Sequence, residues 1–157
     1  MRVIATKDSW KRIPFTSGAP VPYHSVFSRD ELDRLRDGLV PEVMEDKWFA
    51  YFEDPHLFLH RSWTGEPVYR VTLAVGGDGA SVTEALCVAK VIEETNADYQ
   101  AQLLDFLISD LLLGKNKPFP VPPSGWEARP GLLQHAVAGT GFAQRPIARR
   151  RWWQLWR

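Results

Sequence analysis

The chain has 157 residues, of which 45% are hydrophobic and 12% aromatic, and seven are tryptophans. This composition excludes an intrinsically disordered protein for most of the length, because so much apolar surface can offset the conformational entropy lost on folding. Lysine plus arginine equal aspartate plus glutamate at 19 each, so no overall charge attracts nucleic acid or an anionic membrane, and any such affinity must come from a local cluster. A chain of this size can bury one core unaided, and we expect a single domain over residues 1–157.

Sequence signals for export or membrane insertion are missing. Residues 1–15 lack the apolar run of a signal peptide, and no window approaches the roughly 18 apolar residues that span a bilayer. The single cysteine, Cys87, cannot form an intramolecular disulfide and lies in an apolar stretch. We therefore expect a cytoplasmic protein.

The N-terminal part divides into an extended arm and a short helix. Glycine and proline among scattered aromatic residues predict an arm over residues 1–27 that lies on the core without regular periodicity. Ser28 and Glu31 have the spacing of a capping box, in which each side chain accepts a hydrogen bond from the other residue's backbone N–H. The sequence therefore predicts a helix over about 29–39, ended by Gly38.

Residues 47–92 show the pattern of antiparallel strands. Runs rich in aromatic and β-branched residues are separated by short breaks with glycine or proline, and breaks this short join only antiparallel neighbours. The predicted strands are about 47–53, 56–63, 67–75 and 82–92, with a hairpin turn at residues 76–79. The last stretch also fits a helix, because Ser81 and Glu84 could form a second capping box. We favour the strand because its residues partly alternate in polarity.

The long helix is the clearest element. Apolar residues recur at helical spacing over about 96–113, Thr95 or Asn96 can cap the start, and Gly114 can end it. The predicted fold class is therefore α+β, a four-stranded antiparallel β-meander with the long helix on one face and the shorter N-terminal helix beside it. The first two strands are apolar on both faces, so the arm, the C-terminal segment or a partner should cover the second face.

Two stretches resemble a group of small bacterial proteins with no assigned function. They read EDKWF and FLHRSWTG within residues 45–65, and LLDFLISDLLLGK at residues 103–115. The resemblance covers about the middle half of the chain. It implies the order of four strands followed by a long helix, and it brings no catalytic residue with it.

The second predicted strand carries the densest set of polar and aromatic side chains. Alternate residues of a strand share a face, so Arg61 should lie with Leu59 and Trp63, and His60 should point to the other side. An arginine among apolar neighbours must be paired with a carboxylate or meet an anion. We favour the structural alternative, in which the arginine pairs with Glu53 or Glu84 and the histidine is a half-buried side chain with its hydrogen bonds satisfied.

The functional alternative is a pocket in which arginine holds an anionic group, Trp63 stacks on the ligand and His60 transfers a proton. The candidate ligand-binding residues are Arg61, Trp63, Arg70, Tyr51 and Tyr69, and the candidate catalytic residue is His60.

Metal and nucleophile sites find little support in the sequence. On a strand, His56 and His60 would lie about 13 Å apart at roughly 3.3 Å per residue, too far to share a metal ion. Cys87 lies among apolar residues, which should raise its thiol pKa, the opposite of what a nucleophile needs. We predict no metal and no cofactor.

The C-terminal part combines a proline-rich passage over 115–130 with a cationic, tryptophan-rich tail over 145–157. The candidate interaction residues of the tail are Arg149, Arg150, Arg151, Trp152, Trp153 and Trp156. Such a tail can dock on its own domain, engage anionic lipid, stack on nucleic acid or meet a protein partner. Docking on its own domain is favoured, because so much exposed tryptophan would promote aggregation.

No set of residues combines a nucleophile, a base and an orienting group at a recognisable spacing. We therefore interpret the chain as a non-catalytic bacterial interaction or accessory protein with an unknown protein partner. Two alternatives stay open. One is a small-molecule hydrolase or transferase that acts on an anionic, nucleotide-like substrate, and the other is association with anionic membrane or nucleic acid through the tail.

Overall fold

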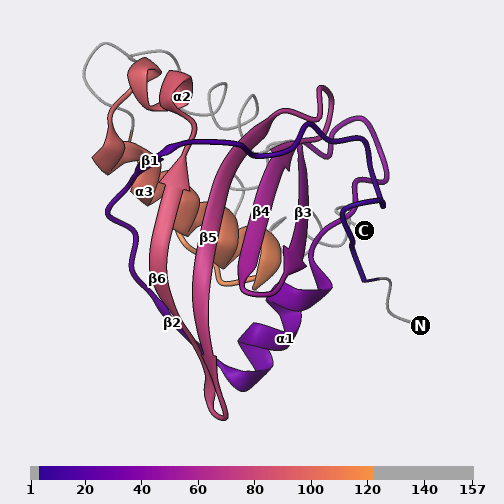
Figure 1. Ribbon diagram of the computed structural model, residues 1–157, viewed down its shortest axis with the longest axis vertical. Coiled ribbons are helices and arrows are strands. Elements are labelled where there is room, and N and C mark those ends of the chain that lie inside the picture. The colour runs from indigo at the N-terminus through magenta and orange to yellow at the C-terminus, as the bar shows by residue number, and fades with distance from the viewer. Residues whose placement is uncertain (1–3, 122–157) are drawn as a thin grey trace.

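The computed structural model describes residues 4–121, which form an antiparallel sheet and the helices packed against it (Figure 1). The elements are β1 (Ala19–Pro20), β2 (Val26–Ser28), α1 (Arg29–Asp37), β3 (Trp48–Glu53), β4 (His56–Arg61), β5 (Pro67–Gly76), β6 (Gly79–Cys87), α2 (Ala89–Glu94), α3 (Ala97–Phe106) and the π-helical η1 (Leu107–Leu112). The sheet order is β1-β6-β5-β4-β3, and β2 also pairs with β6. The predicted α+β class is confirmed, as is the hairpin between β5 and β6.

The predicted number of four strands is too low for the described part of the chain, because the arm contributes two more. Ala19 of β1 lies opposite Cys87, and Phe27 of β2 lies opposite Ala80, both in antiparallel register. Strands of two and three residues are too short to show an alternating pattern. Their pairing depends on the free edge of β6, which local sequence does not reveal.

Helix α1 begins as the sequence predicts. The Ser28 hydroxyl accepts from Glu31 N at 3.2 Å, and Ser28 N donates to the Glu31 carboxylate at 2.9 Å, which completes the capping box. Gly38, with φ of 70°, ends the helix. Two buried leucines, Leu32 and Leu35, anchor α1 in the core.

The last predicted strand, 82–92, is wrong at both ends. β6 occupies residues 79–87, so Ser81 and Glu84 lie in a strand and form no capping box, and residues 89–94 form α2. The backbone N–H of Val88 donates to the carbonyl of Val68 at 3.0 Å, close to the start of β5. Beyond that point no backbone within residues 4–121 pairs with this strand, and a helix then satisfies the N–H and C=O groups internally.

The long helix starts and ends as predicted. The Asn96 side chain accepts from Tyr99 N at 2.7 Å and caps α3, and Gly114 follows the last turn with φ of 70°. The sequence pattern did not predict that the final turn, η1, is π-helical. In this turn Leu113 N donates to the carbonyl of Ile108, five residues earlier.

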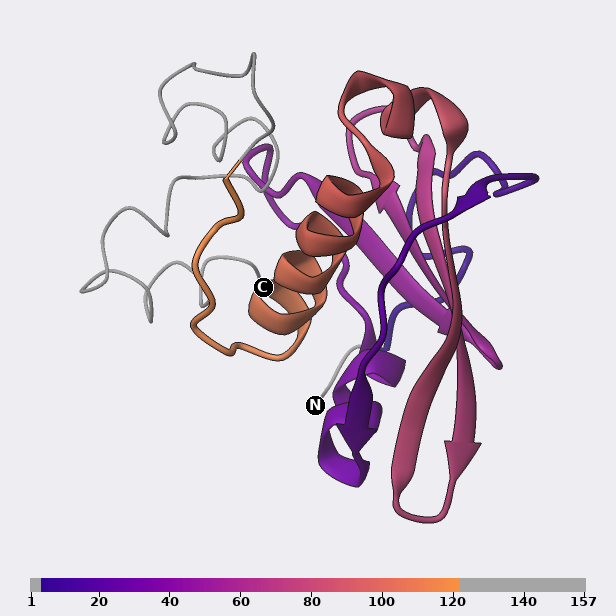
Figure 2. The ribbon, with the colours of Figure 1, turned by 90° about the vertical axis from the view of Figure 1, so that its left-hand side faces the viewer.

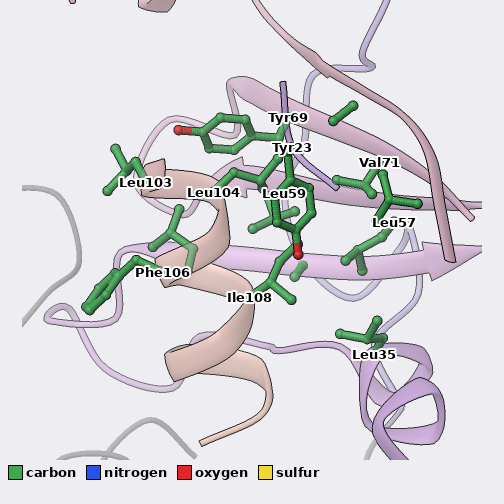
Figure 3. Packing of buried hydrophobic residues seen from close by; sticks show 14 of the residues in the cluster. Tyr23, Leu35, Leu57, Leu59, Tyr69, Val71, Leu103, Leu104, Phe106 and Ile108 are labelled. Carbon is green, nitrogen blue, oxygen red and sulfur yellow. The ribbon is translucent and has the colours of Figure 1, made fainter. Parts of the chain in front are cut away.

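The sheet is covered on both faces. Figure 2 shows α3 lying against one face, and Figure 3 shows Leu104 and Ile108 of this helical segment pointing at the strands, in a core shared with Leu57 and Leu59. Figure 1 shows the arm crossing the sheet on the side opposite α3. There a second cluster joins arm residues to strand residues, formed by Ala5, Trp10, Val40, Phe49, Tyr51 and Phe58. The expectation that the second face is covered therefore holds around Phe49, Tyr51 and His60, where the arm supplies the cover, whereas Arg70 on the same face is only partly buried.

Within residues 4–121, no helix combines the length and the apolar character needed to cross a lipid bilayer.

The pairing of β2 with β6 depends on Gly79. Its φ is +144°, and a Cβ at this position would lie 1.9 Å from the carbonyl oxygen of Phe27. We expect Gly79→Ala to lower the free energy of unfolding by at least about 2 kcal/mol, because the strained backbone and the clash both oppose the pairing. Gly77→Ala in the same hairpin is the matched control, since no atom lies within 4 Å of the added Cβ. Chemical denaturation measures both variants, and equal stabilities would contradict the argument.

Candidate functional site

A cavity of about 290 Å³ lies where β4 ends and β5 begins. Its lining residues come from the strands β3, β4 and β5 on one side, which we call the floor, and from α2 and α3 on the other, which we call the cover. The residues that define its chemistry are Trp48, Arg61, Tyr69, Tyr99, Gln100 and Leu103. The aromatic and aliphatic members form the walls, and Arg61 supplies a positive charge within them.

Arg61 lies on the face of the sheet that α3 covers, together with the buried Leu57 and Leu59, as the alternation of β4 predicts. Its guanidinium carbon is 4.9 Å from the centre of the Trp48 ring, and that ring stacks with Tyr69 at 6.0 Å. Burial lowers the pKa of Arg61, but a guanidinium still keeps its proton at neutral pH. The cavity therefore contains a cation layered on an aromatic wall.

A chain of hydrogen bonds joins three residues that line the same cavity. The Tyr69 hydroxyl donates to the Gln100 side-chain oxygen at 2.5 Å, and the Gln100 amide donates to the Thr95 hydroxyl at 2.8 Å. Burial raises the pKa of Tyr69 well above its ordinary value and that of Tyr99 to about 12. Both phenols are therefore protonated at neutral pH, and neither supplies a base.

An ion pair links two walls of the cavity. The Lys90 ammonium on α2 lies 3.1 Å from the carboxylate of Glu66, which precedes β5. The two side chains are 69% and 44% exposed, so the pair contributes at most about 1 kcal/mol to stability. Glu94, further along α2, is also exposed. The charged side chains of α2 and of Glu66 are thus in contact with solvent, whereas the charged side chain of Arg61 is half-buried.

The sheet separates the residues that the sequence grouped into one pocket. Arg61 and Tyr69 line the cavity, but His60 lies on the opposite face, against Tyr51 and Phe58. Arg70 follows Tyr69 on β5 and is paired in register with Phe58, so it too points away from the cavity. The hypothesis that His60, Arg61 and Trp63 converge is therefore wrong.

His60 is fully buried in an aromatic cluster with Phe49, Tyr51 and Phe58. Its Nδ1 lies 3.1 Å from the carbonyl oxygen of Gly65 and must donate, because a carbonyl only accepts. Its Nε2 has no hydrogen-bond partner in the described part of the chain. Burial lowers the pKa of His60, so the ring is neutral at neutral pH.

Trp63 and Arg70 serve local contacts elsewhere. β4 ends at Arg61, so Trp63 lies in the following turn, 54% exposed, where its indole N–H donates to the Met44 carbonyl at 2.7 Å. Lys47 lies over the Trp63 ring at 3.6 Å. Arg70 pairs with Glu84 at 3.3 Å.

Trp48 and Gln100 line the cavity but were not among the predicted site residues. The sequence contains a pattern that indicates each of them. The turn at residues 54–55 fixes the register of the β3–β4 hairpin, in which Trp48 lies opposite Arg61, so Trp48 was the aromatic partner to expect in place of Trp63. Gln100 lies three and four residues before Leu103 and Leu104, on the buried face of α3. A glutamine on an apolar helix face indicates a buried polar contact.

Other predicted features lie elsewhere. Cys87 is buried, and burial raises its thiol pKa to about 12, as predicted. In the described range 4–121, no group of three or more histidine, cysteine, aspartate or glutamate residues could hold a metal ion. The tail over 145–157, with Arg149, Arg150, Arg151, Trp152, Trp153 and Trp156, lies outside the described residues, as does most of the proline-rich passage, and the interpretations of both stay predictions.

A scan against protein-family models and searches of curated proteins and of solved structures find no match to this chain. The resemblance to small bacterial proteins therefore stays a prediction.

His60 should make stability depend on pH. Its pKa is lowered in the folded state, whereas the unfolded chain binds a proton with the ordinary pKa of about 6.5. The unfolded state therefore gains protons first as the pH falls below about 6.5, and stability is lost in that direction. We expect His60→Gln, whose amide can still donate to Gly65, to lose less free energy of unfolding between about pH 7 and pH 5 than the unchanged chain. Denaturant titrations at both pH values test this, with the exposed His24→Gln as control. A pH dependence that survives in His60→Gln would contradict the assignment.

The Tyr69 hydroxyl should contribute measurably to stability. Tyr69→Phe leaves the buried Gln100 oxygen without its donor, and an unsatisfied buried acceptor costs about 1–3 kcal/mol. Tyr99→Phe is the matched control, because among the described residues the Tyr99 hydroxyl makes one long contact, of 3.4 Å, with the carbonyl of Pro120. Thermal or chemical unfolding compares them, and a larger loss in Tyr99→Phe would refute the proposed network.

Proposed function

We propose that this chain is a non-catalytic accessory protein of the bacterial cytoplasm that binds a small ligand in the cavity between the sheet and the helices α2 and α3. One observation carries the proposal: a half-buried guanidinium, that of Arg61, lies over the Trp48 ring inside a cavity of small-molecule size.

The energetics of Arg61 favour a binding role. Removing a charged group from water costs several kcal/mol, and the contacts of Arg61, that with Trp48 among them, offset part of this cost. Well-packed apolar residues often stabilise such a position better than an ion does. Recognition of an anionic ligand would account for an arginine kept beside Trp48, Tyr69 and Leu103.

The protonation states favour binding over turnover. Tyr69 and Tyr99 hold their protons because burial raises their pKa values, and Glu66 pairs with Lys90. The sequence hypothesis of an enzyme assigned proton transfer to His60, which lies across the sheet from Arg61. Without that residue, the enzyme alternative has no assigned acid or base at the cavity.

The cytoplasmic part of the proposal rests on Cys87. A lone cysteine that is buried, with a thiol pKa of about 12, is compatible with a reducing compartment, where cysteines are used without disulfides.

A cavity-filling variant tests the proposal. Val91 on α2 lines the cavity, so Val91→Trp should place an indole in the space that a ligand would occupy. We expect a thermal-shift screen of small carboxylates, amines and neutral compounds to yield binders of the unchanged chain. A ligand at about 100 times its Kd should stabilise the fold by about 2.7 kcal/mol, and Val91→Trp should abolish this gain.

Glu93→Trp is the matched control, because Glu93 is an exposed residue of the same helix that does not line the cavity. This variant should bind as the unchanged chain does. Failure to find any binder, or equal binding by Val91→Trp, would rule out the cavity as the functional site.

A further inference from the structure

We propose that the ligand of the cavity is a small aromatic carboxylate with a single negative charge. This inference rests on the proposed function and specifies it, because size, charge and wall chemistry each restrict what the cavity can hold.

The volume of the cavity excludes most nucleotide-like molecules, the substrate class that the sequence suggested for an enzyme. At about 290 Å³, the cavity is at the lower limit of small-molecule sites, which span about 300–1,000 Å³. A nucleotide would leave its sugar or its phosphates outside the walls. A molecule with one or two fused rings and a short acidic side chain can be enclosed.

The half-buried charge in the lining of the cavity is the positive charge of Arg61. Arg61 is the half-buried ion, whereas Lys90, Glu66 and Glu94 lie at the solvated rim, where water and salt screen their fields. A guanidinium carries five N–H donors, so it can bind a carboxylate in addition to its existing contacts. A ligand with a single negative charge beside Arg61 gains this interaction, whereas a phosphate with more charge would cost more to remove from water into an enclosed cavity.

Arg61 also discriminates against cations. The face of Trp48 would attract an ammonium group, but the Arg61 guanidinium already lies over it at 4.9 Å. An amine entering the cavity would meet this like charge at short range. The same residue that favours an anion therefore disfavours a positively charged group over the Trp48 ring.

The remaining walls favour an aromatic body. Tyr69, Tyr99 and Leu103 line the cavity with Trp48, and Figure 3 shows Tyr69 and Leu103 close together on the sheet and on α3. The Tyr69 hydroxyl is engaged with Gln100, which leaves its ring for apolar contact. Ring pairs contribute about 0.5–1.5 kcal/mol beyond the area they bury.

A series of three indole compounds tests the charge assignment on the unchanged chain. Indole-3-acetate, indole-3-acetamide and tryptamine share one ring system and carry a negative, a neutral and a positive side chain. Isothermal titration calorimetry should give the tightest binding for indole-3-acetate, weaker binding for the amide by about tenfold, and the weakest for the amine, because charge-assisted hydrogen bonds are the stronger ones.

Substitution of the arginine tests the residue. Arg61→Gln should lower the affinity for indole-3-acetate by about tenfold and change the affinity for indole-3-acetamide by no more than about twofold. Arg70→Gln, on the next strand but on the opposite sheet face, is the matched control and should bind both compounds as the unchanged chain does.

The outcomes separate this inference from the proposed function. Tighter binding of the amide or the amine than of the acetate, or equal binding of the acetate by Arg61→Gln, would overturn the carboxylate assignment and leave a ligand-binding cavity in place. If no indole compound binds and the wider screen with Val91→Trp is also negative, both proposals fail. The comparison of the three indole compounds uses the unchanged chain. It therefore tests the carboxylate assignment even if the Arg61→Gln protein does not fold.

Discussion

The burial of the central strands on both faces is the constraint on which the rest of the structure depends. Helix α3 covers one face of β3, β4 and β5, and the arm covers the other. Successive residues of a strand point to opposite faces, so each polar side chain is assigned to one of two separate interiors. Arg61 belongs to the interior under α3, and His60, its neighbour in the chain, belongs to the one under the arm.

The cavity follows from how the sheet ends. β5 begins at Pro67, so β6 loses its partner after Val88 and the chain turns into α2. The corner between α2 and α3 then covers the ends of β4 and β5. An apolar side chain at residue 61 would let these elements close on one another, whereas a guanidinium needs hydrogen-bond acceptors and polar space around it. The charge of Arg61 and the cavity thus lie at the same place, the corner between α2, α3 and the ends of β4 and β5.

The parts of this structure that local signals determine were predictable from the sequence, and the parts that depend on distant partners were not. The capping box of Ser28 and the placement of Arg61 with Leu57 and Leu59 follow from spacings of a few residues. The end of β4 before Trp63 and the pairing of β1 and β2 with β6 depend on which backbone groups lie nearby in space. The pocket hypothesis also joined His60 to Arg61 although their alternation already placed them on opposite faces, and a sheet between two side chains prevents them from acting on one molecule.

The walls of the cavity differ in how firmly they are held. The floor and α3 carry fully buried residues such as Tyr69 and Leu104, so displacing them would expose much of the core. Helix α2 has no buried residue, and an exposed ion pair, Lys90 with Glu66, helps to hold it to the sheet side. Local opening costs least where few apolar groups are buried, so movement of α2 is the least costly way to admit a molecule to Arg61. A firmly packed floor that positions the cation and a lightly held cover beside it are the arrangement that the proposed ligand binding requires, because a molecule could then reach Arg61 without exposing the core.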